Sequence, residues 1–240
     1  MSGNEQQVLS FLTELFQKCL GFSALNTARS ALSTVLWNDD GITIGRMPSV
    51  KRFMKGVFEL RPVFSRYKDV WDVNIILEYL KLFFPVENLS LRELTHKLVI
   101  LIALVTAQRA QTLCYLNIKD LIIDKEKCVF SVKRNIKNSS HRKSAPIIRI
   151  NRFIEENLCP VFTLEEYIKR TSLLRNEETQ LLISYIKPHN AVSTETVSRW
   201  IKFTMSEGGI DVERYKAHST RVASASAAKR YSVEYDTILS

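Results

Sequence analysis

The chain has 240 residues, carries a formal net charge of +9 at neutral pH and has a sequence pI near 9.4. Apolar residues make up 45% of it, a share typical of a folded protein, which excludes an intrinsically disordered chain. The positive charge predicts an acidic partner, most commonly nucleic acid, although charge alone also fits an ordinary basic protein.

No stretch of the sequence is typical of a secreted or membrane protein. The first seven residues, MSGNEQQ, are polar and do not resemble a signal peptide. The longest apolar run, residues 98–107, is too short to span a bilayer. The four cysteines have no C-x-x-C spacing, so they predict reduced thiols rather than a disulfide or zinc framework. We therefore expect a nuclear or cytoplasmic protein with no membrane partner.

The first 66 residues have the spacing of amphipathic helices. Apolar residues recur every three or four positions between residues 5 and 20, and a second helix is predicted from Thr27 to Trp37. A third opens at Pro48 and ends before Pro62. These helices predict a small helical bundle. The polar face of the third helix carries Lys51, Arg52 and Lys55.

The polar stretch 66–69 marks the expected boundary between a domain of residues 1–66 and one of residues 67–240. A helix is predicted from residue 73 to residue 84. Ser90 and Glu93 then have the spacing of a capping box, which opens a long apolar helix reaching Val105. Arg109 closes this apolar segment, and a charge in that position must be paired or face a functional cleft.

The pattern then changes to short strands, predicted at residues 120–124, 128–132 and 145–150. The loop 133–143, between the second and third strands, is rich in cations, hydroxyls and amides, which suit a phosphate backbone. For most of these charges the alternative, a solvated hairpin tip, is favoured. The fold class expected is therefore mainly α, with a small antiparallel β-sheet in a mostly helical second domain. The cations of the loop are Lys133, Arg134, Lys137, Arg142 and Lys143.

Helices resume after the sheet, and the last of them carries an H-x-x-R pattern. Ser193 or Thr194 caps a helix that ends at Gly208, with Arg199 and Lys202 on its polar side. The stretch 215–228, YKAHSTRVASASAA, follows. On a helix, the spacing of His218 and Arg221 puts both side chains on one face, where they form a donor pair suited to a phosphate. Taken alone, this pattern is weak and favours an ordinary surface helix.

Motifs for cofactors and metals are missing from the sequence. It contains no glycine-rich phosphate loop, no G-x-S-x-G and no carboxylate cluster with metal-ligand spacing. We therefore expect no small-molecule cofactor and no metal ion.

The order of these parts resembles that of the tyrosine recombinase (phage integrase) family: an arginine after a buried helix, a basic hairpin, helices, then H-x-x-R. The stretches TAQRAQTL, KPHNAVSTETVSRWIK and YKAHSTRVASASAA are most similar to the versions in eukaryotic mobile elements of the DIRS-like and Crypton-like kinds. The resemblance implies an integrase-like, DNA breaking-rejoining fold. Residues 1–66 would be its helical core-binding domain and residues 67–240 its catalytic domain.

The resemblance also assigns roles to residues. Arg109 matches the first active-site arginine, and His218 and Arg221 match the H-x-x-R pair. Lys137 matches the active-site lysine, with Lys133 and Lys143 as rivals. The implied partner is double-stranded DNA, on which several copies assemble, and the implied reaction is transesterification through a phosphotyrosine with no metal ion. The residues expected to contact DNA are Lys51, Arg52, Lys55, Lys133, Arg134, Arg142, Lys143, Arg199 and Lys202.

The sequence departs from the family's pattern where the nucleophile belongs. Tyr231 and Tyr235 follow Arg221 too early to match the family's tyrosine, and Thr112 stands where many members carry an acidic residue. We therefore expect an incomplete recombinase that binds DNA without cleaving it. Two alternatives stay open: a non-catalytic DNA-binding module derived from a mobile element, and a basic helical scaffold that binds protein or RNA.

Overall fold

The computed structural model describes residues 5–37, 41–63, 69–133 and 146–230. The chain divides into two compact units, residues 1–68 and residues 69–240. Within the described ranges, no helix is both long enough and apolar enough to cross a membrane.

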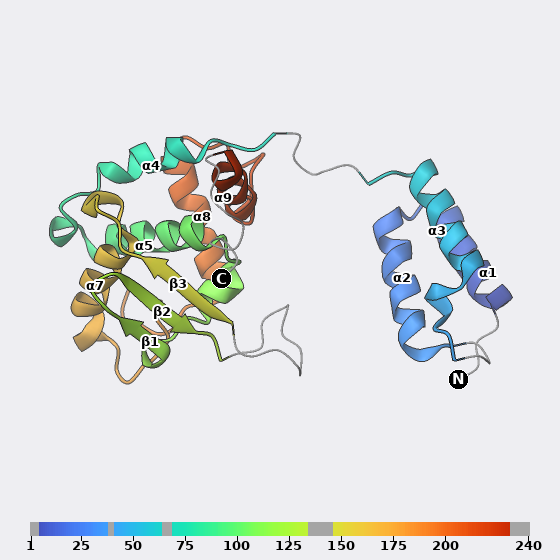
Figure 1. Cartoon of the computed structure of the whole chain (residues 1–240), viewed down its shortest axis with the longest axis horizontal. Coiled ribbons are helices and arrows are strands. Elements are labelled where there is room, and N and C mark those ends of the chain that lie inside the picture. The colour runs from blue at the N-terminus through green and yellow to red at the C-terminus, as the bar shows by residue number, and fades with distance from the viewer. Residues whose placement is uncertain (1–4, 38–40, 64–68, 134–145, 231–240) are drawn as a thin grey trace. The chain divides into compact units, whose positions relative to one another are not determined.

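The first unit is a bundle built from α1 (Glu5–Gln17), α2 (Phe22–Val35) and α3 (Pro48–Leu60) (Figure 1). Its core consists of two clusters of buried side chains, one around Leu12 and one around Leu25. The predicted start of the second helix at Thr27 is wrong, since α2 already begins at Phe22. Its N-cap is Gly21, which makes no side-chain hydrogen bond, so the usual start signal is absent.

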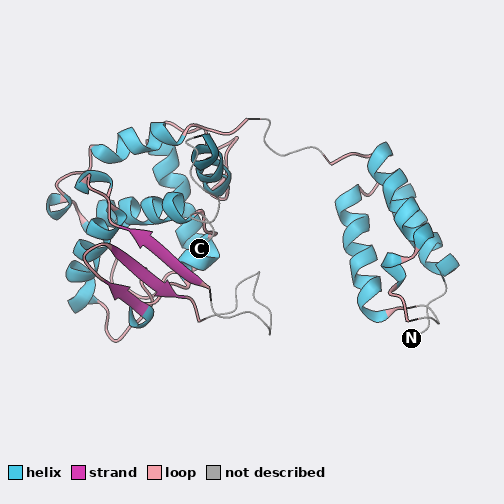
Figure 2. Ribbon diagram, in the orientation of Figure 1, coloured by secondary structure: helices cyan, strands magenta, loops and turns pink. Residues whose placement is uncertain are grey.

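The second unit combines helices with the sheet (Figures 1 and 2). Its helices and strands are α4 (Val73–Lys81), α5 (Leu91–Thr106), α6 (Ala110–Cys114), β1 (Leu121–Ile123), β2 (Lys127–Ser131), β3 (Ile147–Asn151), α7 (Pro160–Thr171), α8 (Thr194–Glu207) and α9 (Ser219–Arg230).

Helix α5 lies at the centre of this unit and is buried along most of its length. Every residue from Leu94 to Leu104 is buried, against α7, α8, α9 and β3 (Figure 1). The predicted capping box is confirmed: the Ser90 hydroxyl accepts a hydrogen bond from the Glu93 backbone N–H, and the Glu93 carboxylate accepts one from the Ser90 N–H. The long apolar run thus forms a helix with apolar neighbours on several sides.

The described strands form an antiparallel sheet in the order β1-β2-β3 (Figure 2). Phe130 pairs with Leu121 on one side and with Ile148 on the other. Phe130, Ile148 and Ile150 are buried, and β3 contacts α5 and α7, so these helices cover one face of the sheet. A mostly helical fold with a small antiparallel sheet is the fold class predicted from the sequence, and that prediction is confirmed.

The capping box predicts a measurable loss of stability when it is removed. Ser90→Ala leaves the Glu93 N–H without its side-chain acceptor and should lower the free energy of unfolding by about 1 kcal/mol. Chemical denaturation followed by tryptophan fluorescence measures this change. Ser206→Ala, at an exposed position within α8, is the matched control and should not destabilise the protein. Equal losses in the two variants would contradict the role assigned to Ser90.

Candidate functional site

The turn that ends α5 places Arg109 at the surface. Ala107 adopts a left-handed conformation, with φ of 49°, and ends the helix. Arg109 is extended, forms the N-cap of α6 and has an exposed side chain. Thr112 and Leu113 in α6 are buried and anchor this turn. Within the described part of the chain, the Arg109 guanidinium has no hydrogen bond or ion pair, so it is available to an anion.

The sequence predicted that both residues of the H-x-x-R pair lie on a helix. In the structure the pair lies at the start of α9, and only Arg221 is inside the helix. His218 belongs to the turn before α9, and Arg221 lies in its first turn. Ser219 and Thr220, between them, are buried, while His218 is exposed and Arg221 is half-buried. The side chains of His218 and Arg221 nevertheless line the same pocket.

Arg109, His218 and Arg221 line one open pocket of about 740 Å³, although Arg109 and Arg221 are far apart in the sequence. Helix α8 adds Arg199 and Lys202 to its wall. Among the described residues that line it, none is Asp or Glu. The cations of the lining are Arg109, Arg199, Lys202, Lys216 and Arg221.

Several of these cations are held by nearby groups, whereas the two central arginines are not. Lys202 lies 3.5 Å from the exposed carboxylate of Glu213, and Lys216 donates a hydrogen bond of 3.2 Å to the Val212 carbonyl. Arg199 donates to the Thr196 hydroxyl at 3.3 Å. The Arg221 guanidinium, like that of Arg109, has no hydrogen bond or ion pair within the described ranges. Permanent cations without carboxylate partners make the pocket attractive to an anion, and guanidinium groups can bind two oxygens of one phosphate.

The predicted hairpin cations are placed only in part. Arg134, Lys137, Arg142 and Lys143 lie outside the described residues. Lys133 is exposed and forms a close ion pair with Asp120, so its ammonium group has an acidic neighbour. In the first unit, Lys51, Arg52 and Lys55 are exposed on α3, and Lys55 lies 3.8 Å from Glu59.

Sequence reasoning missed some residues of the pocket. Gln108 and Gln111 flank Arg109 and bring amide groups to the lining, and Ser198 adds a hydroxyl from α8. Lys216 is the missed cation, although it stands two positions before His218 in the same motif. The signal that could have identified it is its positive charge close to Arg221, since clustered Lys and Arg residues mark a surface that binds nucleic acid.

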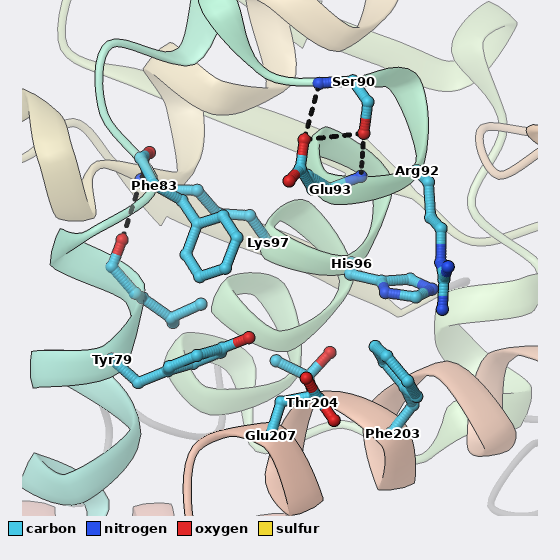
Figure 3. Close-up of a pocket in the computed structure, with 11 residues that line it drawn as sticks. Tyr79, Phe83, Ser90, Arg92, Glu93, His96, Lys97, Phe203, Thr204 and Glu207 are labelled. Carbon is cyan, nitrogen blue, oxygen red and sulfur yellow. Dashed lines mark hydrogen bonds between the residues drawn. The ribbon is translucent and has the colours of Figure 1, made fainter.

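A second, smaller pocket of about 290 Å³ lies at the other end of α5, between α4 and α8 (Figure 3). Lys97 is buried there and donates hydrogen bonds to the carbonyl oxygens of Leu80 and Phe83. Leu80 lies in the last turn of α4, and Phe83 follows the end of that helix. Burial lowers the pKa of Lys97 to about 8. Arg92 and Lys97 are matched in this lining by two carboxylates, Glu93 and Glu207. Its charges are therefore balanced, unlike those of the first pocket.

His96 also lines this second pocket. Its ring packs against Phe203 at 5.0 Å and Tyr185 at 5.5 Å between centroids, and its buried Nε2 has no hydrogen-bond partner among the described residues. Burial, with a smaller contribution from the nearby Arg92 charge, lowers the pKa of His96 to about 4. The imidazole is therefore neutral at physiological pH and serves the aromatic packing around it.

Residues 75–238 of the chain match the phage integrase family, so the match covers more than half of the sequence. The chain belongs to the phage integrase family. This agrees with the tyrosine recombinase resemblance of its motifs. No curated protein matches the chain.

Solved structures of recombinases of this kind share the fold. XerH site-specific recombinase in a post-cleavage complex with its palindromic difH substrate aligns with a TM-score of 0.59 and 14% identity. That alignment covers 98% of this chain and 64% of XerH, so the chain spans less than two thirds of that relative. XerA recombinase aligns with a TM-score of 0.51 and 16% identity, over 97% of this chain and 77% of XerA. A lambda integrase tetramer bound to a Holliday junction gives 0.51 and 18%, over 99% of this chain and 63% of that one.

The lowered pKa of His96 predicts a specific acid sensitivity. Its folded-state pKa of about 4 lies below the ordinary value of 6.5, so between these pH values the unfolded chain binds a proton that the folded chain does not. Lowering the pH from 7 to 4.5 should therefore cost the wild type roughly 2–3 kcal/mol more free energy of unfolding than His96→Phe. Urea denaturation at the two pH values measures the difference. The same loss in both proteins would show that His96 is not buried in its neutral form.

Proposed function

We propose that the pocket around Arg109, His218 and Arg221 binds a phosphate of duplex DNA, at which members of this family break and rejoin strands. The observation that carries the proposal is the pairing of Arg109 and Arg221 in one lining that contains no carboxylate among its described residues. Arg109 is the N-cap of α6 and Arg221 lies in the first turn of α9, and neither guanidinium has a hydrogen bond or ion pair in the described part of the chain. Membership of the phage integrase family supports the same reading.

The residue types suit strand transesterification. Attack on a phosphodiester places additional negative charge on a pentavalent phosphoryl centre, which Arg109 and Arg221 would neutralise without a metal ion. His218 would donate a hydrogen bond to a phosphate oxygen or assist proton transfer. The lysine that protonates the leaving sugar oxygen is assigned to Lys137, with Lys133 and Lys143 as its rivals. In this family a tyrosine is the nucleophile and conserves the bond energy in a phosphotyrosyl link.

The remaining cations are assigned to the DNA on either side of this phosphate. Arg199, Lys202 and Lys216 share the pocket lining and would contact neighbouring phosphates of the same duplex. We propose that residues 1–66 are a core-binding domain, whose contacts would come from Lys51, Arg52 and Lys55, and that residues 67–240 are the catalytic-like domain. The hairpin cations Arg134, Arg142 and Lys143 complete the proposed DNA surface.

The proposal extends to how copies of the chain assemble on DNA and to the origin of its sequence. The solved XerH structure holds a difH substrate, and a lambda integrase structure is a tetramer on a Holliday junction. By analogy we propose that several copies of this chain assemble on double-stranded DNA, and we place the protein in the nucleus or the cytoplasm. The stretches TAQRAQTL and YKAHSTRVASASAA support an origin in eukaryotic mobile elements of the DIRS-like or Crypton-like kind.

The proposal predicts that DNA affinity depends on both arginines. Arg109→Ala and Arg221→Ala should each weaken binding to a short duplex by at least about tenfold at low salt, because a hydrogen bond to a charged group contributes roughly 1.5–3 kcal/mol. Each variant should also reduce the slope of log K against log salt by about one. Fluorescence anisotropy at several salt concentrations measures both quantities.

The matched control removes one positive charge elsewhere in the same unit. Lys187 is exposed and does not line the pocket, so Lys187→Ala should bind almost as tightly as the wild type. An equal loss of affinity in Arg109→Ala, Arg221→Ala and Lys187→Ala would show that DNA binding depends on net charge alone and not on the pocket. Binding that does not respond to salt would instead favour a scaffold for protein partners.

A further inference from the structure

Residues 69–72 are bonded to the segment that carries His218 and Arg221. The indole Nε1 of Trp71 donates a hydrogen bond of 2.9 Å to the Ser219 hydroxyl, across 148 positions of sequence. Both side chains are buried: Trp71 is 5% exposed and Ser219 is 2% exposed. Trp71 stands just before Asp72, the N-cap of α4, so the bond joins the start of α4 to the start of α9.

Two ion pairs flank this hydrogen bond. Asp69 accepts from Arg214 at 2.6 Å, and Asp72 lies 4.0 Å from Arg230. All four side chains are substantially exposed, so these pairs contribute little by themselves. The Trp71 hydrogen bond is different because it is shielded from water. In the protein interior a hydrogen bond is stronger than in water, and a buried donor without an acceptor costs free energy.

Among its described residues, helix α9 buries only small side chains. Its buried residues are Ser219, Thr220 and Ala223, all of them small. Small side chains let the helix approach α4 and α5 closely, but they interlock poorly with neighbouring side chains. Orientation at the first turn therefore depends on directional contacts. Ser219 lies between His218 and Arg221, so a rotation there would move both side chains relative to Arg109.

We propose that Trp71 is a positioning residue of the phosphate-binding pocket. It does not line the pocket. Its indole N–H holds Ser219, and Ser219 holds His218 and Arg221 in the lining that they share with Arg109. The inference rests on the proposed function, since it assigns Trp71 a role in the binding of the same DNA phosphate.

The test removes each end of the hydrogen bond. Trp71→Phe keeps a large aromatic ring but loses the donor, and Ser219→Ala loses the acceptor. Each should weaken duplex binding about fivefold, and the double variant should bind no more weakly than the weaker single variant, because both changes remove one interaction. Affinity is measured by anisotropy well below each variant's thermal midpoint. Ser224→Ala is the control. It removes a different hydroxyl of α9, one that donates a hydrogen bond to the Thr220 carbonyl of the same helix, and this variant should bind like the wild type.

A second background separates positioning from a general loss of structure. In His218→Ala/Arg221→Ala, adding Trp71→Phe should change the affinity by less than twofold, because the side chains that Trp71 positions are gone. A fivefold further loss in that background would overturn the proposal. If Trp71→Phe fails to fold, Ser219→Ala alone decides the outcome in both backgrounds.

The same measurements distinguish the two levels of inference. If His218→Ala/Arg221→Ala binds the duplex as tightly as the wild type, the proposed function itself fails. If that variant binds weakly while Trp71→Phe and Ser219→Ala bind normally, only the positioning role is overturned.

Discussion

The burial of α5 is the constraint on which the second unit depends. A helix with apolar side chains on several sides must be enclosed, and α7, α8, α9 and β3 pack around it. Its C-terminal half, from Leu98 to Thr106, carries no charged residue, and Arg109 stands beyond its end, after the left-handed turn at Ala107. The pocket therefore forms at one end of the buried helix, where the chain reaches the surface.

The other half of the pocket arrives from a distant part of the sequence and is held differently. Helix α9 brings only small buried side chains to its neighbours, and the Trp71 to Ser219 hydrogen bond supplies the direction that packing lacks. The opposite end of α5 shows the complementary solution, in which buried Lys97 binds the carbonyls at the end of α4 and carboxylates balance the nearby cations. The charges of that lining are balanced, whereas the lining at the Arg109 end carries an excess of positive charge that suits an anion.

Local signals in the sequence predicted the elements, and contacts between distant residues set the details. The Ser90 capping box and the alternating strands depend on neighbouring residues, so the sequence shows them directly. The start of α2 has no such signal, because Gly21 makes no side-chain bond. The order of motifs singled out Arg109, His218 and Arg221, but periodicity could not show that His218 precedes its helix. The bond between Trp71 and Ser219 spans 148 positions, and no local pattern encodes it.

The central claim is that Arg109 and Arg221 bind the same phosphate of a DNA duplex. A crystal structure of the chain with a short duplex tests this most directly. We predict one backbone phosphate within hydrogen-bond distance of both guanidinium groups, with the His218 imidazole beside it. A duplex bound on another surface, with no phosphate in contact with both arginines, would contradict the account.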